Sequence, residues 1–110
     1  MTDLEMTRLC AEAMGLVIRE LPVTVEESIR AHCVEYQSRH FYNQWLLYDP
    51  LHEDEQAMAL VKKCRLGVTA APCEYGTWAV SGVGCGTLNE SLNRAICECV
   101  AKMQQARAGK

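Results

Sequence analysis

The apolar positions near the C-terminal end of the chain repeat with the period of an amphipathic helix. They fall three or four residues apart and form one stripe, made of Leu92, Ala95, Ile96, Cys99, Val100 and Met103. A continuous stripe at this spacing predicts a helix that packs one face against a core. Thr87 is the expected N-cap, because Glu90 follows three residues later and completes a capping box.

Two earlier stretches combine helical spacing with helix start signals. Residues 3–14 follow Thr2, which makes a capping box with Glu5, and Gly15 is the expected C-cap. Asp54 is the expected N-cap of the second stretch. Its apolar positions at helical spacing are Ala57, Leu60, Val61 and Cys64. Both stretches predict helices with one apolar face.

Short runs with β-branched residues predict strands, since such side chains favour a pleated surface. The expected strands are Leu16–Arg19, Leu66–Ala70 and Thr77–Ser81. Pro72 and Gly76 bracket a turn between the last two strands, which predicts a hairpin around Trp78. The glycine-rich stretch Gly82–Gly86 then predicts a flexible loop before the last helix.

These elements predict an α+β fold with a small antiparallel sheet of about three strands flanked by helices, in an α/β/α sandwich-like arrangement. The chain has 110 residues, of which 49% are hydrophobic and 23% are charged. That is ordinary globular composition and argues against disorder. We therefore expect a single domain over residues 1–110.

A divergent segment with helical and aromatic features occupies residues 20–46. Thr24 and Glu27 could form another capping box, which would open a helix through about Tyr36. Five of the seven aromatic residues are Tyr36, Phe41, Tyr42, Trp45 and Tyr48. Because Tyr and Trp are enriched at interface hot spots, the candidate partner-binding residues are Tyr36, Phe41, Tyr42 and Trp45. The alternative is that these rings pack the segment onto the domain.

Charge is divided unevenly along the chain, although the net charge is only −3. Residues 1–60 carry eleven acidic and four basic side chains, a net charge of −7, whereas residues 61–110 carry three and seven, a net charge of +4. An acidic half disfavours nucleic acid and suits a basic partner; the alternative is a solvated acidic face. The sequence has neither a stretch of ~20 apolar residues nor signal-peptide features, so we expect a cytoplasmic protein without membrane contact.

Seven cysteines are many for this length, and an odd number without a secretion signal favours reduced thiols. Zinc ligands usually occur as close Cys or His pairs. Cys97 and Cys99 lie two residues apart on an expected helix and point to different sides, and His32 and Cys33 are adjacent and expected to diverge. We therefore expect no structural disulfide, no metal and no cofactor.

Cys85 is the best candidate for a nucleophile. It lies in the Gly82–Gly86 stretch just before an expected helix N-terminus, where a thiolate would be stabilised. A base such as His40 or His52 would also have to lie nearby. The same glycines suggest a phosphate-binding loop, but they do not match G-x-G-x-x-G. The simpler interpretation is a small residue in a tight loop, so we assign no catalytic residue.

Several short motifs, in this order and spacing, resemble the phage ABA-sandwich domain family. They are Ala11–Gly15, Tyr48–Leu51, Gln56–Leu60, Trp78 on a strand, and Leu92–Ile96 followed by Val100–Ala101. The resemblance covers about residues 5–18 and 46–104, and residues 19–45 lie outside it. It implies a compact sheet flanked by helices, encoded by a phage or prophage. Because the family has no established activity, it implies no catalytic residues.

The favoured function is a non-enzymatic binding protein. Small phage-encoded domains often bind host proteins, so we expect an inhibitor of a host defence system, of the anti-CRISPR type, acting in the host cytoplasm. Its expected partner is a host protein, such as one that handles nucleic acid, with no direct nucleic-acid contact and no membrane. One alternative is an enzyme or nucleotide-binding protein that uses the Cys85 loop. The other is a structural phage protein that forms a homo-oligomer.

Overall fold

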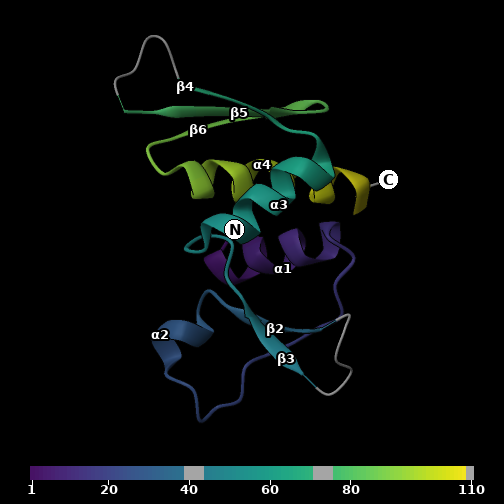
Figure 1. Cartoon of the computed structure of the whole chain (residues 1–110), viewed down its shortest axis with the longest axis vertical. Helices are drawn as coiled ribbons and strands as arrows, with labels where there is room; N and C mark the ends of the chain where they lie inside the picture. Colours follow the sequence, from purple (N-terminus) through teal and green to yellow (C-terminus); the bar gives the residue numbers. More distant parts are fainter. Residues whose placement is uncertain (39–43, 71–75, 109–110) are drawn as a thin grey trace.

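The computed structural model describes residues 1–38, 44–70 and 76–108, and it places helices between two small sheets (Figure 1). Sheet A contains β1 (Ile18–Arg19), β2 (Val34–Gln37) and β3 (Trp45–Tyr48), and sheet B contains β4 (Gly67–Ala70), β5 (Trp78–Gly82) and β6 (Cys85–Asn89). The described helices are α1 (Asp3–Ala13), α2 (Glu27–Arg30), α3 (Asp54–Cys64) and α4 (Leu92–Ala108). The two sheets form opposite ends of the longest axis, which extends 46 Å.

The α+β class and the small antiparallel three-stranded sheet are confirmed. The expected grouping of the strands is wrong, because the segment around Leu16–Arg19 does not join the hairpin. β1 pairs with β2, which pairs with β3, whereas β4, β5 and β6 form a separate sheet. The helices α1, α3 and α4 therefore lie between two sheets, with sheet B over α4 and sheet A below α1 (Figure 1).

Local sequence signals fix both ends of α1, as predicted. The Thr2 hydroxyl oxygen accepts a hydrogen bond from the Glu5 amide at 3.1 Å. At the other end, Gly15 has a φ of +70°, its amide donates to the Glu12 carbonyl, and the Leu16 amide donates to the Ala11 carbonyl. This is a Schellman motif, in which glycine adopts the left-handed conformation at low cost.

Helix α4 is the centre of the core and is buried on more than one face. The predicted apolar stripe is buried, with Ile96, Cys99 and Val100 fully so. Part of it packs under sheet B, where the β6 residue Thr87 donates its hydroxyl to the Ala95 carbonyl at 2.6 Å, whereas Val100 faces the space between α1 and α3. A second buried face, which the stripe does not include, consists of Cys97 and Ala101. It meets α1, where the Cys10 thiol lies 3.6 Å from the Cys97 carbonyl oxygen.

The start of α4 differs from the prediction. Thr87 is a residue of β6 and not the N-cap; the helix begins at Leu92, and the Ser91 hydroxyl oxygen accepts from the Arg94 amide at 3.3 Å. The expected loop Gly82–Gly86 is instead the end of β5, a tight turn and the start of β6. Gly84 supplies the positive φ that the turn requires, at +72°.

The divergent segment holds the largest error in the sequence interpretation. The helix expected from Thr24 through about Tyr36 shrinks to α2, whose N-cap Glu26 makes no side-chain capping bond. Val34 and Tyr36 lie in β2, where they pair with β3 residues in an antiparallel register. Pairing with β3, the next strand along the chain, overrides the local capping signal.

The expected hairpin is present, with β4 and β5 antiparallel and Ala70 opposite Trp78. Helix α3 also forms as predicted, although its first residue is Asp54 and its N-cap is Glu53, which makes no side-chain capping bond. It ends at Cys64, and its C-cap Arg65 has a φ of +53°. The Leu66 amide then donates to the Val61 carbonyl at 3.0 Å and leads the chain into sheet B.

Candidate functional site

The aromatic residues predicted to bind a partner lie in different environments. The rings of Tyr36 and Tyr48 meet edge to face, with centroids 5.8 Å apart, and Tyr36 packs against the core. Trp45 lies opposite Gln37 at the end of sheet A, and the Arg19 guanidinium covers its ring at 4.1 Å. Tyr36 is therefore a packing residue, whereas Trp45 remains a candidate for partner contact. The other two candidates, Phe41 and Tyr42, lie outside the described residues.

The outer face of sheet A is polar and internally paired. Arg19, Glu35 and Leu47 lie side by side across the three strands. The Arg19 guanidinium also forms an ion pair with the Glu35 carboxylate at 3.3 Å. Leu47 is 47% exposed and Val17, whose carbonyl accepts from the Gln37 amide, is 60% exposed, so exposed apolar side chains lie beside the charged groups of this face.

Sheet B differs, because its sequence is almost free of charge. Residues 66–89 include one charged residue, Glu74, and it lies outside the described residues. Alternate residues of the three strands point away from α4, and we call them the outer face of sheet B: Gly67, Thr69, Ala79, Ser81, Gly86 and Leu88. They form two cross-strand rows, Gly67–Ser81–Gly86 and Thr69–Ala79–Leu88. None of these six residues is charged, although Glu98 and Lys102 of α4 line the same hollow, and Leu88 is 57% exposed.

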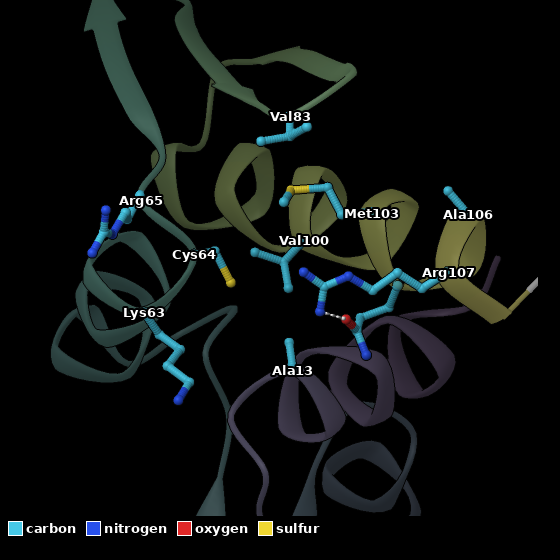
Figure 2. Close-up of a pocket in the computed structure, with 10 residues that line it drawn as sticks. Ala13, Lys63, Cys64, Arg65, Val83, Val100, Met103, Ala106 and Arg107 are labelled. Carbon is cyan, nitrogen blue, oxygen red and sulfur yellow. Dashed lines mark hydrogen bonds between the residues drawn. The ribbon is translucent and has the colours of Figure 1, made fainter.

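A cleft of about 450 Å³ lies where the C-terminal parts of α1, α3 and α4 converge (Figure 2). Its apolar lining includes Ala13 of α1 and Val100 and Met103 of α4, and its cationic lining consists of Lys63, Arg65 and Arg107. The Arg107 side chain reaches back along α4 and donates a hydrogen bond to the Gln104 side-chain oxygen at 3.4 Å. The residue types alone suggest an anion site.

Helix electrostatics account for these cations without a ligand. The carbonyl end of a helix carries partial negative charge, and cations in the last turn offset it. The C-terminal ends of α1, α3 and α4 meet at the cleft, and α1 has no basic residue of its own in its last turn. Burial raises the pKa of the Cys64 thiol above its ordinary value, although Arg107 and Lys63 oppose the shift. Cys64 therefore stays protonated at neutral pH and is a poor nucleophile.

The sequence interpretation placed Cys85 just before a helix N-terminus, and the structure shows that this is wrong. It is the first residue of β6, opposite Gly82, and α4 begins only at Leu92. Its thiol contacts Cys99 of α4, whose pKa is raised to about 12, first by burial and then by Cys85. The geometry that would have activated Cys85 is absent, so the thiol acts as a packing group here.

A cluster of metal-ligand residues lies at the junction of sheet A and α3. One ligand atom from each of His32, Cys33 and Asp49 lies within 4.8 Å of the others. His52 joins them, because its Nδ1 is 3.0 and 2.9 Å from the two Asp49 carboxylate oxygens. The His32 Nε2 is 3.6 Å from the same carboxylate, and the two imidazole centroids are 4.7 Å apart. The expectation that His32 and Cys33 diverge is wrong.

The backbone holds both sides of this cluster. The buried Thr7 hydroxyl of α1 donates to the His32 carbonyl at 2.8 Å, and the Cys33 amide donates to the Ile29 carbonyl at 3.1 Å. The Asp49 amide donates to the Gln56 side-chain oxygen at 2.6 Å, while the Asp49 carbonyl accepts from the Glu53 amide at 2.9 Å. These hydrogen bonds hold the backbone of His32, Cys33 and Asp49 in place without a bound metal ion.

Burial and charge at the cluster are unusual. Cys33 is 2% exposed and Asp49 is 7% exposed. Burial raises the pKa of the Cys33 thiol to about 12, and the Asp49 carboxylate adds to this shift by its charge and by a hydrogen bond. No lysine or arginine in the described part of the chain forms an ion pair with Asp49. Among the described residues, two imidazoles and the Cys33 thiol face this buried carboxylate.

No family model, curated protein or solved structure matches the chain significantly. The resemblance to the phage ABA-sandwich domain therefore rests on the short motifs quoted above. Within residues 1–38, 44–70 and 76–108, no helix is both long enough and apolar enough to cross a membrane.

Proposed function

We propose that the protein is a non-enzymatic binding module that acts by contact with another protein through the outer face of sheet B. The observation that carries this proposal is the near absence of charge from residues 66–89 in a chain that is 23% charged. Charged residues are depleted from the buried centres of protein interfaces, because their desolvation is costly. Sheet B has the composition of such a centre, although its outer face is exposed.

The shape of this surface supports the same function. Small residues on the outer face leave an open hollow, which Glu98 and Lys102 of α4 also line, and Leu88 provides one exposed apolar side chain. Val83, in the turn between β5 and β6, is 90% exposed but lines the cleft of Figure 2 and does not belong to this face. The edge strands β4 and β6 also lack the lysines and prolines that usually discourage pairing with other chains.

The thiols support a binding role over catalysis. Burial raises the pKa values of the Cys33, Cys64 and Cys99 thiols, which keeps them protonated at neutral pH. A thiol nucleophile needs the opposite shift. The cationic cleft of Figure 2 is likewise explained by the helix ends that meet there.

The identity of the partner rests on the family resemblance. We propose a phage- or prophage-encoded protein whose partner is a host protein, with inhibition of a host defence system, of the anti-CRISPR type, as the specific form. The acidic N-terminal half would favour a basic partner, such as a protein that handles nucleic acid. A salt-sensitive association would follow from that charge.

A site-specific crosslinking experiment tests the binding surface. A photoreactive phenylalanine analogue replaces Leu88 on the outer face of sheet B or, as the control, Met58 on α3, which is 43% exposed. Both proteins are irradiated in host lysate, and a partner crosslinked at position 88 but not at position 58 is identified and purified. Leu88→Glu should then weaken its binding at least tenfold, because the new charge is desolvated in the complex, and Met58→Glu should leave binding unchanged.

Equal crosslinking at both positions, or unchanged affinity of the Leu88→Glu variant, would overturn the proposal. Crosslinks at position 88 only between copies of the chain would instead support the oligomerising alternative. Light scattering of the purified protein distinguishes that case, since a homo-oligomer would show a multiple of the 12.3 kDa chain mass. Melting midpoints of the two glutamate variants must match the wild type, so that loss of binding is not loss of fold.

A further inference from the structure

We propose that His32, Cys33 and Asp49 bind one Zn²⁺ ion, with His52 positioning the Asp49 carboxylate. The three residues supply an imidazole nitrogen, a thiolate sulfur and a carboxylate oxygen, which is a donor set that Zn²⁺ accepts. They come from the turn after α2 and from the end of β3. This site is independent of the binding surface proposed for sheet B, which lies at the other end of the molecule (Figure 1).

The distances suit a small tetrahedral ion. Zinc lies about 2.0–2.3 Å from nitrogen, oxygen and sulfur ligands, so tetrahedral ligand atoms are about 3.3–3.8 Å apart. The His32 Nε2 and an Asp49 carboxylate oxygen are already 3.6 Å apart, and no pair in the three-residue group exceeds 4.8 Å. Closing the remaining gap requires side-chain movements of about 1 Å or less, with no change in the backbone.

Charge balance favours a divalent cation at this position. Asp49 is buried, and its partners among the described residues are imidazoles and a thiol rather than a lysine or arginine. A buried carboxylate is costly unless a cation neutralises it. One Zn²⁺ ion bound to a carboxylate, a thiolate and a neutral imidazole gives a site with no net charge. The proton of the Cys33 thiol leaves to solvent as the S–Zn bond forms.

The surrounding structure gives the ion a structural role. Helix α2 has only four residues, none of them buried, and Val23 before it is 84% exposed. This part of the chain therefore has little core of its own. An ion held by His32 and Cys33 on one side and Asp49 on the other would tie the α2 segment to the start of α3. Metal binding then contributes directly to folding stability.

His52 is a positioning residue in this site. Its Nδ1 lies within hydrogen-bond distance of both Asp49 oxygens, and its side chain is 61% exposed. Hydrogen bonds to a ligating carboxylate orient it toward the ion, and their loss typically weakens metal binding by about 10- to 100-fold. Three protein ligands also leave a fourth position open to water.

Cobalt substitution tests the assignment in the untagged, reduced protein after chelator treatment. Co²⁺ should bind one equivalent and produce the near-ultraviolet charge-transfer absorption of a thiolate–cobalt bond, and Zn²⁺ should displace it. Cys33→Ser should abolish this absorption. Cys64→Ser is the matched control, since Cys64 lies outside the cluster, and should retain it. No charge-transfer band in the wild type, a band that survives Cys33→Ser, or one lost equally in Cys64→Ser would overturn the proposal.

A second measurement needs no substitution, in case Cys33→Ser fails to fold. Cadmium-113 added to the wild-type protein should show proton–cadmium couplings to the Cys33 β-protons and the His32 ring. Couplings to any other cysteine, or none, contradict the site. His52→Gln should weaken Zn²⁺ affinity about 10- to 100-fold while keeping the cobalt band, whereas unchanged affinity would remove His52 from the proposal.

Discussion

Val34 lies directly opposite Tyr48 in the antiparallel pair of β2 and β3. The next position along the same register brings Cys33 opposite Asp49, although sixteen residues separate them in the sequence. Tyr48 is 3% exposed and Val34 is fully buried, so the core holds this register in place. The cluster of metal-ligand residues is thus a consequence of how sheet A pairs, and not of a short sequence motif.

The first prediction concerns the centre of α4. Ile96→Ala should lower the free energy of unfolding by about 2–5 kcal/mol, because it leaves a cavity among fully buried neighbours. Met58→Ala, on the exposed side of α3, should change it by less than about 0.5 kcal/mol. Urea unfolding curves measure both. A small loss for Ile96→Ala would mean that α4 is not the central helix.

The second prediction concerns Gln56, whose side-chain amide acts as an additional strand partner for β3. It donates to the Leu47 carbonyl at 3.0 Å and accepts from the Asp49 amide at 2.6 Å. Gln56→Ala should cost about 1–3 kcal/mol, since both backbone groups lose their partner. Gln105→Ala, at an exposed position of α4, is the control and should be near neutral. Equal effects of the two substitutions in urea unfolding would contradict the proposed bridge.

Gln56 also shows what the sequence could not reveal. Local signals predicted α1 with Thr2 and Gly15, the stripe of α4 and the β4–β5 hairpin, because capping and periodicity depend on residues close in sequence. The β2–β3 pairing joins residues no further apart in sequence than the β4–β5 hairpin does. Residues 38–44 between these strands contain no glycine or proline to mark a turn, and a capping box at Thr24 suggested a helix there instead. Spacing in the sequence likewise did not show that His32, Cys33 and Asp49 lie close together, because strand pairing brings them into contact.

The sequence interpretation missed the strand β6 for a different reason. Glycines at 82, 84 and 86 indicated a loop, yet only Gly84 has a positive φ among them. Gly82 is needed for space, since a Cβ there would lie 2.5 Å from the Met103 sulfur of α4. Glycine therefore served close packing of a strand against a helix, which composition does not distinguish from a loop.

The third prediction concerns alkaline pH. Cys99 is fully buried, and its pKa is raised to about 12 from an ordinary value of 9.0. Above about pH 9 the unfolded chain loses this proton while the folded protein keeps it, so stability must fall as pH rises toward the folded pKa. One such thiol contributes a slope of up to about 1.4 kcal/mol per pH unit.

Urea unfolding under reducing conditions between about pH 8 and pH 11 measures this slope. Other buried thiols also contribute to the slope of unfolding free energy against pH. Cys99→Ala should make this slope shallower by up to the contribution of one proton. Stability that is constant or rises over this range would show that the Cys99 thiol ionises as readily in the folded protein as in the unfolded chain.

The last prediction compares Tyr36 and Trp45, which have different surroundings in sheet A. Tyr36→Ala should lower the free energy of unfolding by about 3 kcal/mol, the range for loss of a large ring, reduced by its partial exposure, because it removes the edge-to-face contact with Tyr48. Trp45→Ala should cost less than about 1 kcal/mol, because its ring contacts the exposed Arg19 side chain and not the core.

Binding of the partner identified by crosslinking then assigns the function of Trp45. If sheet A contributes to that interface, Trp45→Ala should weaken binding while the far-UV circular dichroism and the melting midpoint stay close to wild type. Arg19→Ala is the matched control: it uncovers the Trp45 ring without removing it. Loss of binding in Trp45→Ala but not in Arg19→Ala would place the indole in the interface. Unchanged binding in both would leave the outer face of sheet B as the contact surface and make Trp45 a side chain that only covers the end of sheet A.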